Sequence, residues 1–232
     1  MAEKLSIVEQ SSNVDQWLER ETPRIRQALE SASRYFDGND SLTVNTLEAV
    51  YGQESSFGTM LGTRGSASAA GHFQFTPETA MRYGLSVSKN NDQRFDIDYA
   101  SSAAARYLKD LDTMFSKRTT LARQRDTITV AGGSERKKFV LGAFNAGEGR
   151  IARAQRRAEK VGKNPQSWED VARHLSRETQ QYVEQIPLYE AEFALKSPAN
   201  KNIKKQGVRK GQYRCTVGHW RTIDDRPVFI CA

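Results

Sequence analysis

Glu54 is a carboxylate on the apolar face of a predicted helix. The segment 42–58 is predicted to be helical, and Leu47 and Tyr51 share one face with Glu54 at three- and four-residue spacing. Burial and the negative end of the helix dipole both disfavour an ionised carboxylate, so the pKa of Glu54 is expected to be raised. A raised pKa suits a general acid near neutral pH. The structural alternative is a side chain that extends to the surface or pairs with a nearby arginine such as Arg64, since such pairs also shift pKa values.

Three further motifs follow the Glu-Ser pair at 54–55. They are AAGHFQFTPETA at 69–80, AFNAGEG at 143–149 and ETQQYV at 178–183. In this order the four motifs resemble the soluble lytic transglycosylase family, goose-lysozyme-like enzymes that cleave the glycan strands of peptidoglycan. The resemblance covers about 42–196. Four separated motifs in one order are far more specific than any of them alone.

The resemblance assigns the first half of a site. Glu54 matches the catalytic acid, and Ser55 matches the neighbouring hydroxyl. Gln74 matches a glutamine that reaches into the sugar groove, and Phe73 replaces a Met while keeping an apolar groove contact. His72 replaces a Leu, which is expected to place a titratable group next to the groove.

The second half of the implied site comes from the later motifs. Phe144 and Asn145 match a Tyr-Asn pair beside the scissile bond, and Phe144 lacks the family hydroxyl. Glu178 and Tyr182 match residues on a late helix that close the cleft and support the residues that line the site. These departures put the rate and the pH optimum in question more than the class of reaction.

The resemblance implies a reaction that needs one carboxylate. Glu54 protonates the oxygen between N-acetylmuramic acid and N-acetylglucosamine. It then takes the proton of the muramyl C6 hydroxyl, which closes a 1,6-anhydro ring without consuming water. A paired-acid glycosidase instead needs a second carboxylate about 5 to 9.5 Å away.

Two other functions remain open from the residues. A muramidase that hydrolyses the bond would need Asp96 or Asp98 to position a water, although these residues are better explained as caps of the following helix. A domain that binds glycan without cleaving it would keep the fold and lose turnover, since fold does not prove function. The retained Glu54 argues against that alternative.

The elements that must position these side chains are mainly helical. The 232 residues are enough for one domain with a core and appendages. The predicted fold is mainly α, a goose-type lysozyme-like domain with a small C-terminal β-hairpin or ribbon. Pro187 is expected to kink the last helix or to split it. Beyond 42–58, helices are predicted over 97–115, 135–144, 149–161, 167–174 and 178–195. The predicted organisation is a helical N-terminal extension (1–40), the catalytic domain (41–197), and a basic linker with the β tail (198–232).

The tail from 211 to 232 is rich in β-prone residues and contains both cysteines. Facing strands could bring Cys215 and Cys231 together as a disulfide in an oxidising compartment, and two free thiols are equally allowed. No Cys/His cluster has metal-ligand spacing, so no metal and no cofactor are expected.

The net charge of +7 is concentrated after the enzyme-like region. A solvated linker is the default explanation of this basic run, and attraction to anionic cell-envelope polymers is the alternative. Nucleic acid is disfavoured because no recognition motif accompanies the charge. The run consists of Lys201, Lys204, Lys205, Arg209, Lys210 and Arg214.

The residues 1–40 lack the apolar region of a secretory signal, and no transmembrane span is predicted. We therefore expect an enzyme made in the cytoplasm that reaches the periplasm or cell wall by another route. Delivery by a secretion machine as an antibacterial effector is favoured slightly over release by a phage as a lysin or virion component. A chain whose signal was removed is the third route. An effector implies a cognate immunity protein and a secretion carrier as partners, besides peptidoglycan.

Overall fold

The computed structural model describes residues 12–63, 68–122 and 125–196, together with the backbone of 218–223 and 226–231. The chain divides into two compact units, 1–194 and 195–232, and each is described by itself. Arg64, Cys215 and the basic run after 200 lie outside the described residues, so the predictions made for them stay predictions.

Helix α3 (Val44–Ser55) carries the residue on which the sequence argument rests. The apolar face is present, since Leu47 and Tyr51 are fully buried. The amphipathic prediction was wrong for the middle of the helix, where seven successive residues (46–52) are all buried. Several regions surround it: Arg26 lies 4.0 Å from Glu48, and Lys137 donates to the Thr46 hydroxyl. On a third side, the Trp17 ring of α1 (Asn13–Glu19) packs against Gly52 so closely that a Cβ there would lie 2.3 Å from it.

Helix α5 (Ile97–Ser116) is the central helix of this unit. It confirms the helix predicted over 97–115, and Ala104, Leu108 and Leu111 on one of its faces are fully buried. The helix packs against α2 (Pro23–Ala32), α3 and α6 (Ser134–Ala146). It thereby joins the helices on both sides of the unit.

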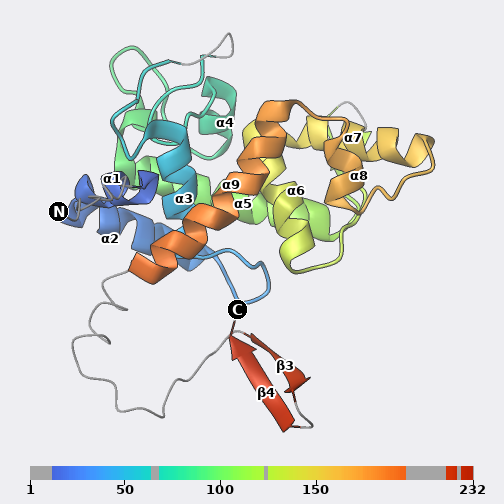
Figure 1. Ribbon diagram of the computed structural model, residues 1–232. Helices are drawn as coiled ribbons and strands as arrows, with labels where there is room; N and C mark the ends of the chain where they lie inside the picture. Colours follow the sequence, from blue (N-terminus) through green and yellow to red (C-terminus); the bar gives the residue numbers. More distant parts are fainter. Residues whose placement is uncertain (1–11, 64–67, 123–124, 197–217, 224–225, 232) are drawn as a thin grey trace, which may run out of the picture. The chain divides into compact units, whose positions relative to one another are not determined.

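Helices α6, α7 (Glu148–Lys160) and α8 (Trp168–Ala172) form one group in Figure 1, on the opposite side from α1, α2 and α3. Gly147 separates α6 from α7 with a φ of 86°, a conformation that glycine adopts without steric cost. The Trp168 ring packs against α6 at Gly142, where a Cβ would lie 2.4 Å from it.

Helix α9 (Arg177–Lys196) runs diagonally between these two groups (Figure 1). It is a single helix that continues through Pro187, so the predicted split does not occur. Its C-terminal half packs on α1, where Phe193 stacks on Trp17 with ring centroids 6.2 Å apart. The N-terminal helices thus share the hydrophobic core of the catalytic region, and Val14 and Leu29 are fully buried in it.

The smaller elements of the first unit connect these helices. They are the 3-10 helices η1 (Ser33–Tyr35) and η2 (Gln93–Phe95), the short helix α4 (Pro77–Arg82), and the two-residue antiparallel strands β1 (Thr120–Leu121) and β2 (Arg125–Asp126).

The second unit contains an antiparallel pair, β3 (Gly218–Ile223) and β4 (Arg226–Cys231), in which Gly218 is opposite Cys231. The predicted hairpin is therefore confirmed. None of the helices in the described part of the chain is both long and apolar enough to span a membrane.

Candidate active site

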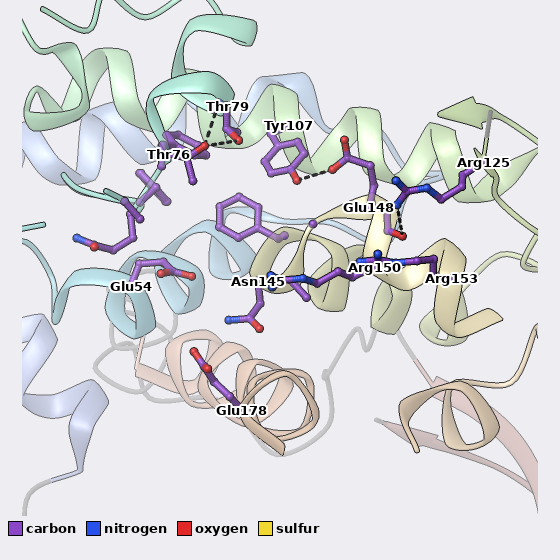
Figure 2. Close-up of a pocket in the computed structure, with 18 residues that line it drawn as sticks. Glu54, Thr76, Thr79, Tyr107, Arg125, Asn145, Glu148, Arg150, Arg153 and Glu178 are labelled. Atoms are coloured by element: carbon purple, nitrogen blue, oxygen red, sulfur yellow. Dashed lines mark hydrogen bonds between the residues drawn. The ribbon is translucent and has the colours of Figure 1, made fainter. Parts of the chain in front are cut away.

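A cleft of about 630 Å³ lies between α3, α6 and the segments that lead into α4 and α7 (Figure 2). Six of the predicted site residues meet on its wall, although they come from regions far apart in the sequence. These residues are Glu54, Phe73, Gln74, Phe144, Asn145 and Glu178.

Glu54 is half-buried one residue before the end of α3, and its carboxylate faces the cleft. Its Oε1 accepts a hydrogen bond from the Tyr182 hydroxyl at 2.8 Å. Tyr182 is buried on α9, and burial first, then the negative charge and hydrogen bond of Glu54, hold its pKa well above the ordinary value. The phenol therefore keeps its proton and acts as a donor that fixes the acid.

The chain turns sharply at the end of α3, two residues after Glu54. Ser56, Phe57 and Gly58 all have positive φ angles of 48°, 58° and 84°. Such angles are unfavourable for residues with side chains and persist where the surroundings enforce them. A Cβ on Gly58 would lie 2.4 Å from the Tyr51 hydroxyl, so this turn admits no larger residue without movement. The turn ends α3 next to the acid.

Ser55 lies away from the cleft despite its place beside the acid. It is fully buried, and its hydroxyl donates to the Tyr51 carbonyl at 3.2 Å and accepts from the Gly58 N–H at 3.1 Å. The described contacts therefore give Ser55 a role in shaping the turn after Glu54, and they do not place it among the groups that can touch a sugar.

His72 also turns away from the cleft, which corrects the expectation of a titratable group beside the groove. Its ring nitrogens contact the Tyr51 hydroxyl at 3.0 Å and the Phe95 carbonyl at 3.2 Å. Burial lowers the pKa of His72, so the neutral imidazole is favoured and bridges two parts of the core.

Gln74 lines the cleft and also ties together the loop that forms its edge. Its side-chain nitrogen donates to the Gly71 carbonyl at 2.9 Å and to the Met60 carbonyl at 3.3 Å. Its backbone has a φ of 47°, which is uncommon for a residue with a side chain. The amide thus holds the loop in place from the position expected for a sugar contact.

Arg94 is a supporting residue that the sequence argument missed. It is 8% exposed, and its Nη1 donates to the carbonyls of Ser68 and Phe75 at 2.9 and 3.0 Å. Asp92 pairs with the same guanidinium, and this hydrogen bond lowers the pKa of Asp92 against the effect of burial. The buried ion pair fixes both ends of the 68–75 loop against η2.

One wall of the cleft is aromatic. The Phe144 ring packs on Phe75 and on Tyr107, with ring centroids 5.9 and 5.3 Å apart, and Phe73 continues the wall beyond Phe75. Phe144 is 9% exposed, so an edge of its ring contributes to the cleft surface. Such a surface can pack against the apolar faces of sugar rings.

Asn145 and Glu178 are polar residues that also line the cleft. The side-chain oxygen of Asn145 accepts a hydrogen bond from the Thr179 hydroxyl at 2.8 Å, so the amide nitrogen of Asn145 remains as a donor. Glu178 is exposed at the start of α9, and in the view of Figure 2 Asn145 lies between Glu178 and Tyr107. Asn145 is therefore oriented by the same helix that carries Tyr182.

Glu148 is a second cleft carboxylate, at the start of α7. Its oxygens accept from Arg82 Nη1 at 2.8 Å and from the Tyr107 hydroxyl at 3.1 Å. Burial alone would raise its pKa, but its own backbone N–H and Arg82 outweigh that effect and the net shift is downward. Glu148 is therefore held in its ionised form by Arg82 and Tyr107, and a general acid would need the protonated form.

Asp96 and Asp98 lie outside the cleft wall. Asp96 caps α5 by accepting from the Asp98 N–H at 2.9 Å, and Arg24 pairs with both carboxylates. The capping interpretation is confirmed for Asp96, and Asp98 lies in the first turn of α5, so both acids are placed to stabilise that helix and not to position a water. Within the described ranges, no group of three His, Cys, Asp or Glu side chains is arranged to hold a metal ion.

Three arginines line one end of the cleft, and they were not predicted from the sequence as site residues. Arg125 and Arg153 lie at the end of the cleft opposite Glu54, next to Glu148 (Figure 2), and Arg150 also lines it. The signal was present in the three-residue spacing of Arg150 and Arg153 on one helix face.

Comparisons with known proteins agree with this site. A model of the transglycosylase SLT domain matches residues 34–167. Membrane-bound lytic murein transglycosylase D of Escherichia coli (strain K12) is 34% identical over 143 residues, which are 62% of this chain and 25% of that protein. Membrane-bound lytic murein transglycosylase F of Maricaulis maris (strain MCS10) is 33% identical over 105 residues, 45% of this chain and 19% of that protein. The matched regions are thus a quarter or less of these relatives.

The matched region contains α3 with Glu54, the loop with Gln74, and the Phe144-Asn145 pair. It ends before α9, so Tyr182 and Glu178 lie beyond it. The family model covers more than half of the chain, and the mainly helical, lysozyme-like fold agrees with it. The chain belongs to the transglycosylase SLT domain family.

Proposed function

We propose that this protein is a peptidoglycan lytic transglycosylase that uses Glu54 as its only proton-transfer residue. The observation that carries the proposal is the contrast between Glu54 and Glu148, the two half-buried carboxylates of the cleft. Glu148 is occupied by Arg82 and Tyr107, whereas Glu54 faces the cleft and is held by the neutral hydroxyl of Tyr182. A cleft built in this way supports chemistry with a single acid. The names of the relatives supply the substrate, since both are called murein transglycosylases.

The reaction balances with one residue. Protonated Glu54 donates to the glycosidic oxygen, the bond from that oxygen to muramyl C1 breaks, and N-acetylglucosamine leaves with a free C4 hydroxyl. Ionised Glu54 then accepts the proton of the muramyl C6 hydroxyl while O6 forms a bond to C1. The product is 1,6-anhydro-N-acetylmuramic acid, no water is consumed, and Glu54 is protonated again.

Each supporting group has a place in this scheme. Tyr182 orients Glu54 for both proton transfers, which is the type of alignment on which acid–base catalysis depends. The aromatic wall around Phe144 supplies a surface for a sugar ring, and the amide of Asn145 supplies a donor for a sugar oxygen or an N-acetyl carbonyl.

The test is mass spectrometry of soluble products from purified peptidoglycan. The native protein is expected to release anhydro-muramyl products, and Glu54→Gln is expected to lower their rate by about a thousandfold or more, within the range for loss of a general acid. Glu159→Gln is the matched control, because Glu159 is exposed and pairs only with Arg156 among the described contacts. Products with reducing ends would overturn the transglycosylase in favour of a muramidase.

Delivery as an antibacterial effector stays a prediction, as do an immunity protein and a secretion carrier. Its test is production of the chain in Escherichia coli with and without an added periplasmic leader. Lysis only with the leader, and only while Glu54 is intact, would support action in the periplasm. Equal growth of both cultures would argue against a toxin.

A further inference from the structure

The face of α7 beside the cleft carries a row of arginines. Arg150, Arg153 and Arg157 follow one another at spacings of three and four residues, which places them on one side of the helix. The row continues the line of Ala146 at the end of α6, next to Asn145 of the proposed active site. We call these three residues the arginine row.

The arginine row is unpaired in the part of the chain that the structure describes. No carboxylate within 12–63, 68–122 and 125–196 lies in ion-pair distance of it. Other exposed arginines nearby are paired: Arg156 with Glu159 at 3.0 Å, and Arg173 with Glu169 at 3.1 Å. The difference is one of position, because the paired residues face away from the cavities and the row lines them.

The row connects two cavities. Arg150, Arg153 and Ala146 belong both to the cleft and to a second pocket of about 330 Å³. Arg157 belongs only to the second pocket. The rest of its wall is Ala154, His174, Leu175, Ser176 and Thr179. The pocket therefore offers guanidinium donors, since the Thr179 hydroxyl already donates to Asn145, and no carboxylate lines it.

We infer that this second pocket binds carboxylates of the peptide stem that hangs from the muramyl residue. The inference rests on the proposed function, since it needs a muramyl residue next to Asn145. Arg150 to Arg157 spans about 10 Å along the helix, which equals about three residues of extended peptide. Guanidinium groups match the planar geometry of carboxylates and bind them with two parallel hydrogen bonds.

The continuity of the cavities favours the stem over an unattached anion. A stem is covalently joined to the sugar, so a sugar in the cleft brings the stem to the shared wall at Arg150 and Arg153. The second binding event is then intramolecular and profits from a high effective concentration. A row of exposed arginines can in this way contribute to affinity although each ion pair alone is weak.

The experiment measures binding by the Glu54→Gln protein, so that it does not depend on turnover. The probes are peptidoglycan free of attached polymers, and the same material after an amidase has removed the stems. Arg157→Glu tests the pocket, and Arg156→Glu is the control with the same charge change on the neighbouring, paired arginine. Thermal unfolding of both variants checks that the fold is intact.

Arg157→Glu is expected to weaken binding to stem-bearing peptidoglycan about tenfold, which corresponds to about 1.4 kcal/mol. Arg156→Glu should stay within about twofold, and both variants should bind stripped strands equally. In the active protein the same change should raise KM and leave kcat unaltered. Equal losses in both variants, or a loss that persists on stripped strands, would overturn the stem site. Absence of anhydro products with intact stem-dependent binding would instead refute the proposed reaction alone.

Discussion

Helices α3 and α7 border the same cleft and are built in opposite ways. The middle of α3 is buried on all sides, and its single functional group, Glu54, is fixed by a buried tyrosine from another helix. Helix α7 buries one face and presents the arginine row on the other. Position is therefore enforced at the acid and left to flexible side chains at the basic end.

The difference indicates a division of labour. Proton transfer tolerates little displacement, because an error of about 1 Å can cost a hundredfold in rate. Recognition of a flexible, charged peptide needs reach and charge more than fixed geometry. The comparison predicts that conservative changes are costly on α3 and mild on α7.

Of the conservative changes considered, Glu54→Asp should lower the catalytic rate most strongly. It retains a carboxylate but retracts it by about one carbon–carbon bond from the Tyr182 hydroxyl and from the substrate. We expect kcat to fall by about a hundredfold or more, with little change in KM. Steady-state release of anhydro products measures it. A loss below about threefold would contradict the claim that position is enforced at α3.

Glu48→Gln tests whether the middle of α3 is buried, through the pH dependence of the free energy of unfolding. Burial first, then the charge of Glu21, raises the pKa of Glu48 to about 7, partly opposed by Arg26. A raised pKa stabilises the folded state below the unfolded value of about 4.5, and this contribution is lost as pH rises through about 7. The native protein should therefore lose up to about 3 kcal/mol between pH 5 and pH 8 from this group.

The Gln variant should lack that dependence. Urea unfolding of both proteins at pH 5 and pH 8 isolates the Glu48 contribution as a difference between them, because His72, which acts in the opposite sense below about pH 6.5, is common to both. Parallel pH dependence in the two proteins would show that Glu48 is solvated.

Tyr182→Phe removes the hydroxyl that positions Glu54 and leaves the ring packing in place. We expect kcat to fall about tenfold. The alkaline limb of the pH–rate profile, which reports loss of the acid's proton, should move to higher pH, because a donor to the ionised carboxylate is gone. A lower rate with an unmoved profile would indicate a purely structural role for Tyr182.

Arg157→Lys should have the smallest effect. The charge remains and only the planar, bidentate geometry is lost, so KM on stem-bearing peptidoglycan should rise by about twofold. Turnover at saturating substrate should not change. A tenfold rise in KM would mean that the position of the charged group matters as much at Arg157 as at Glu54.

The sequence predicted the elements well where their patterns are local. The periodic burial of Leu108 and Leu111 and the cap at Asp96 follow from short-range rules, and both are found. The burial of α3 on all sides could not be read from its own residues, because residues distant in sequence, such as Trp17 at Gly52 and Arg26 at Glu48, cover the positions that the pattern left exposed.

The sequence predicted which residues line the site, but it did not predict most of the hydrogen bonds that hold them in place. Glu54, Gln74 and Asn145 meet at one cleft, in keeping with the motif order. The inward turn of Ser55 depends on a backbone turn with three positive φ angles, which no local pattern announced. Contacts such as Arg94 with the Ser68 carbonyl depend on tertiary structure, so a sequence pattern gives no access to them.

The hydrogen bond between Tyr182 and Glu54 joins residues that are 128 positions apart. During synthesis, Glu54 is translated early, yet it reaches its final surroundings only after α9 has been made and has docked on the rest of the unit. A truncated product that ends with the family-matched region at residue 167 would contain the acid without its partner. The smallest competent piece of this chain is therefore longer than its family signature, and unfinished copies lack the assembled acid.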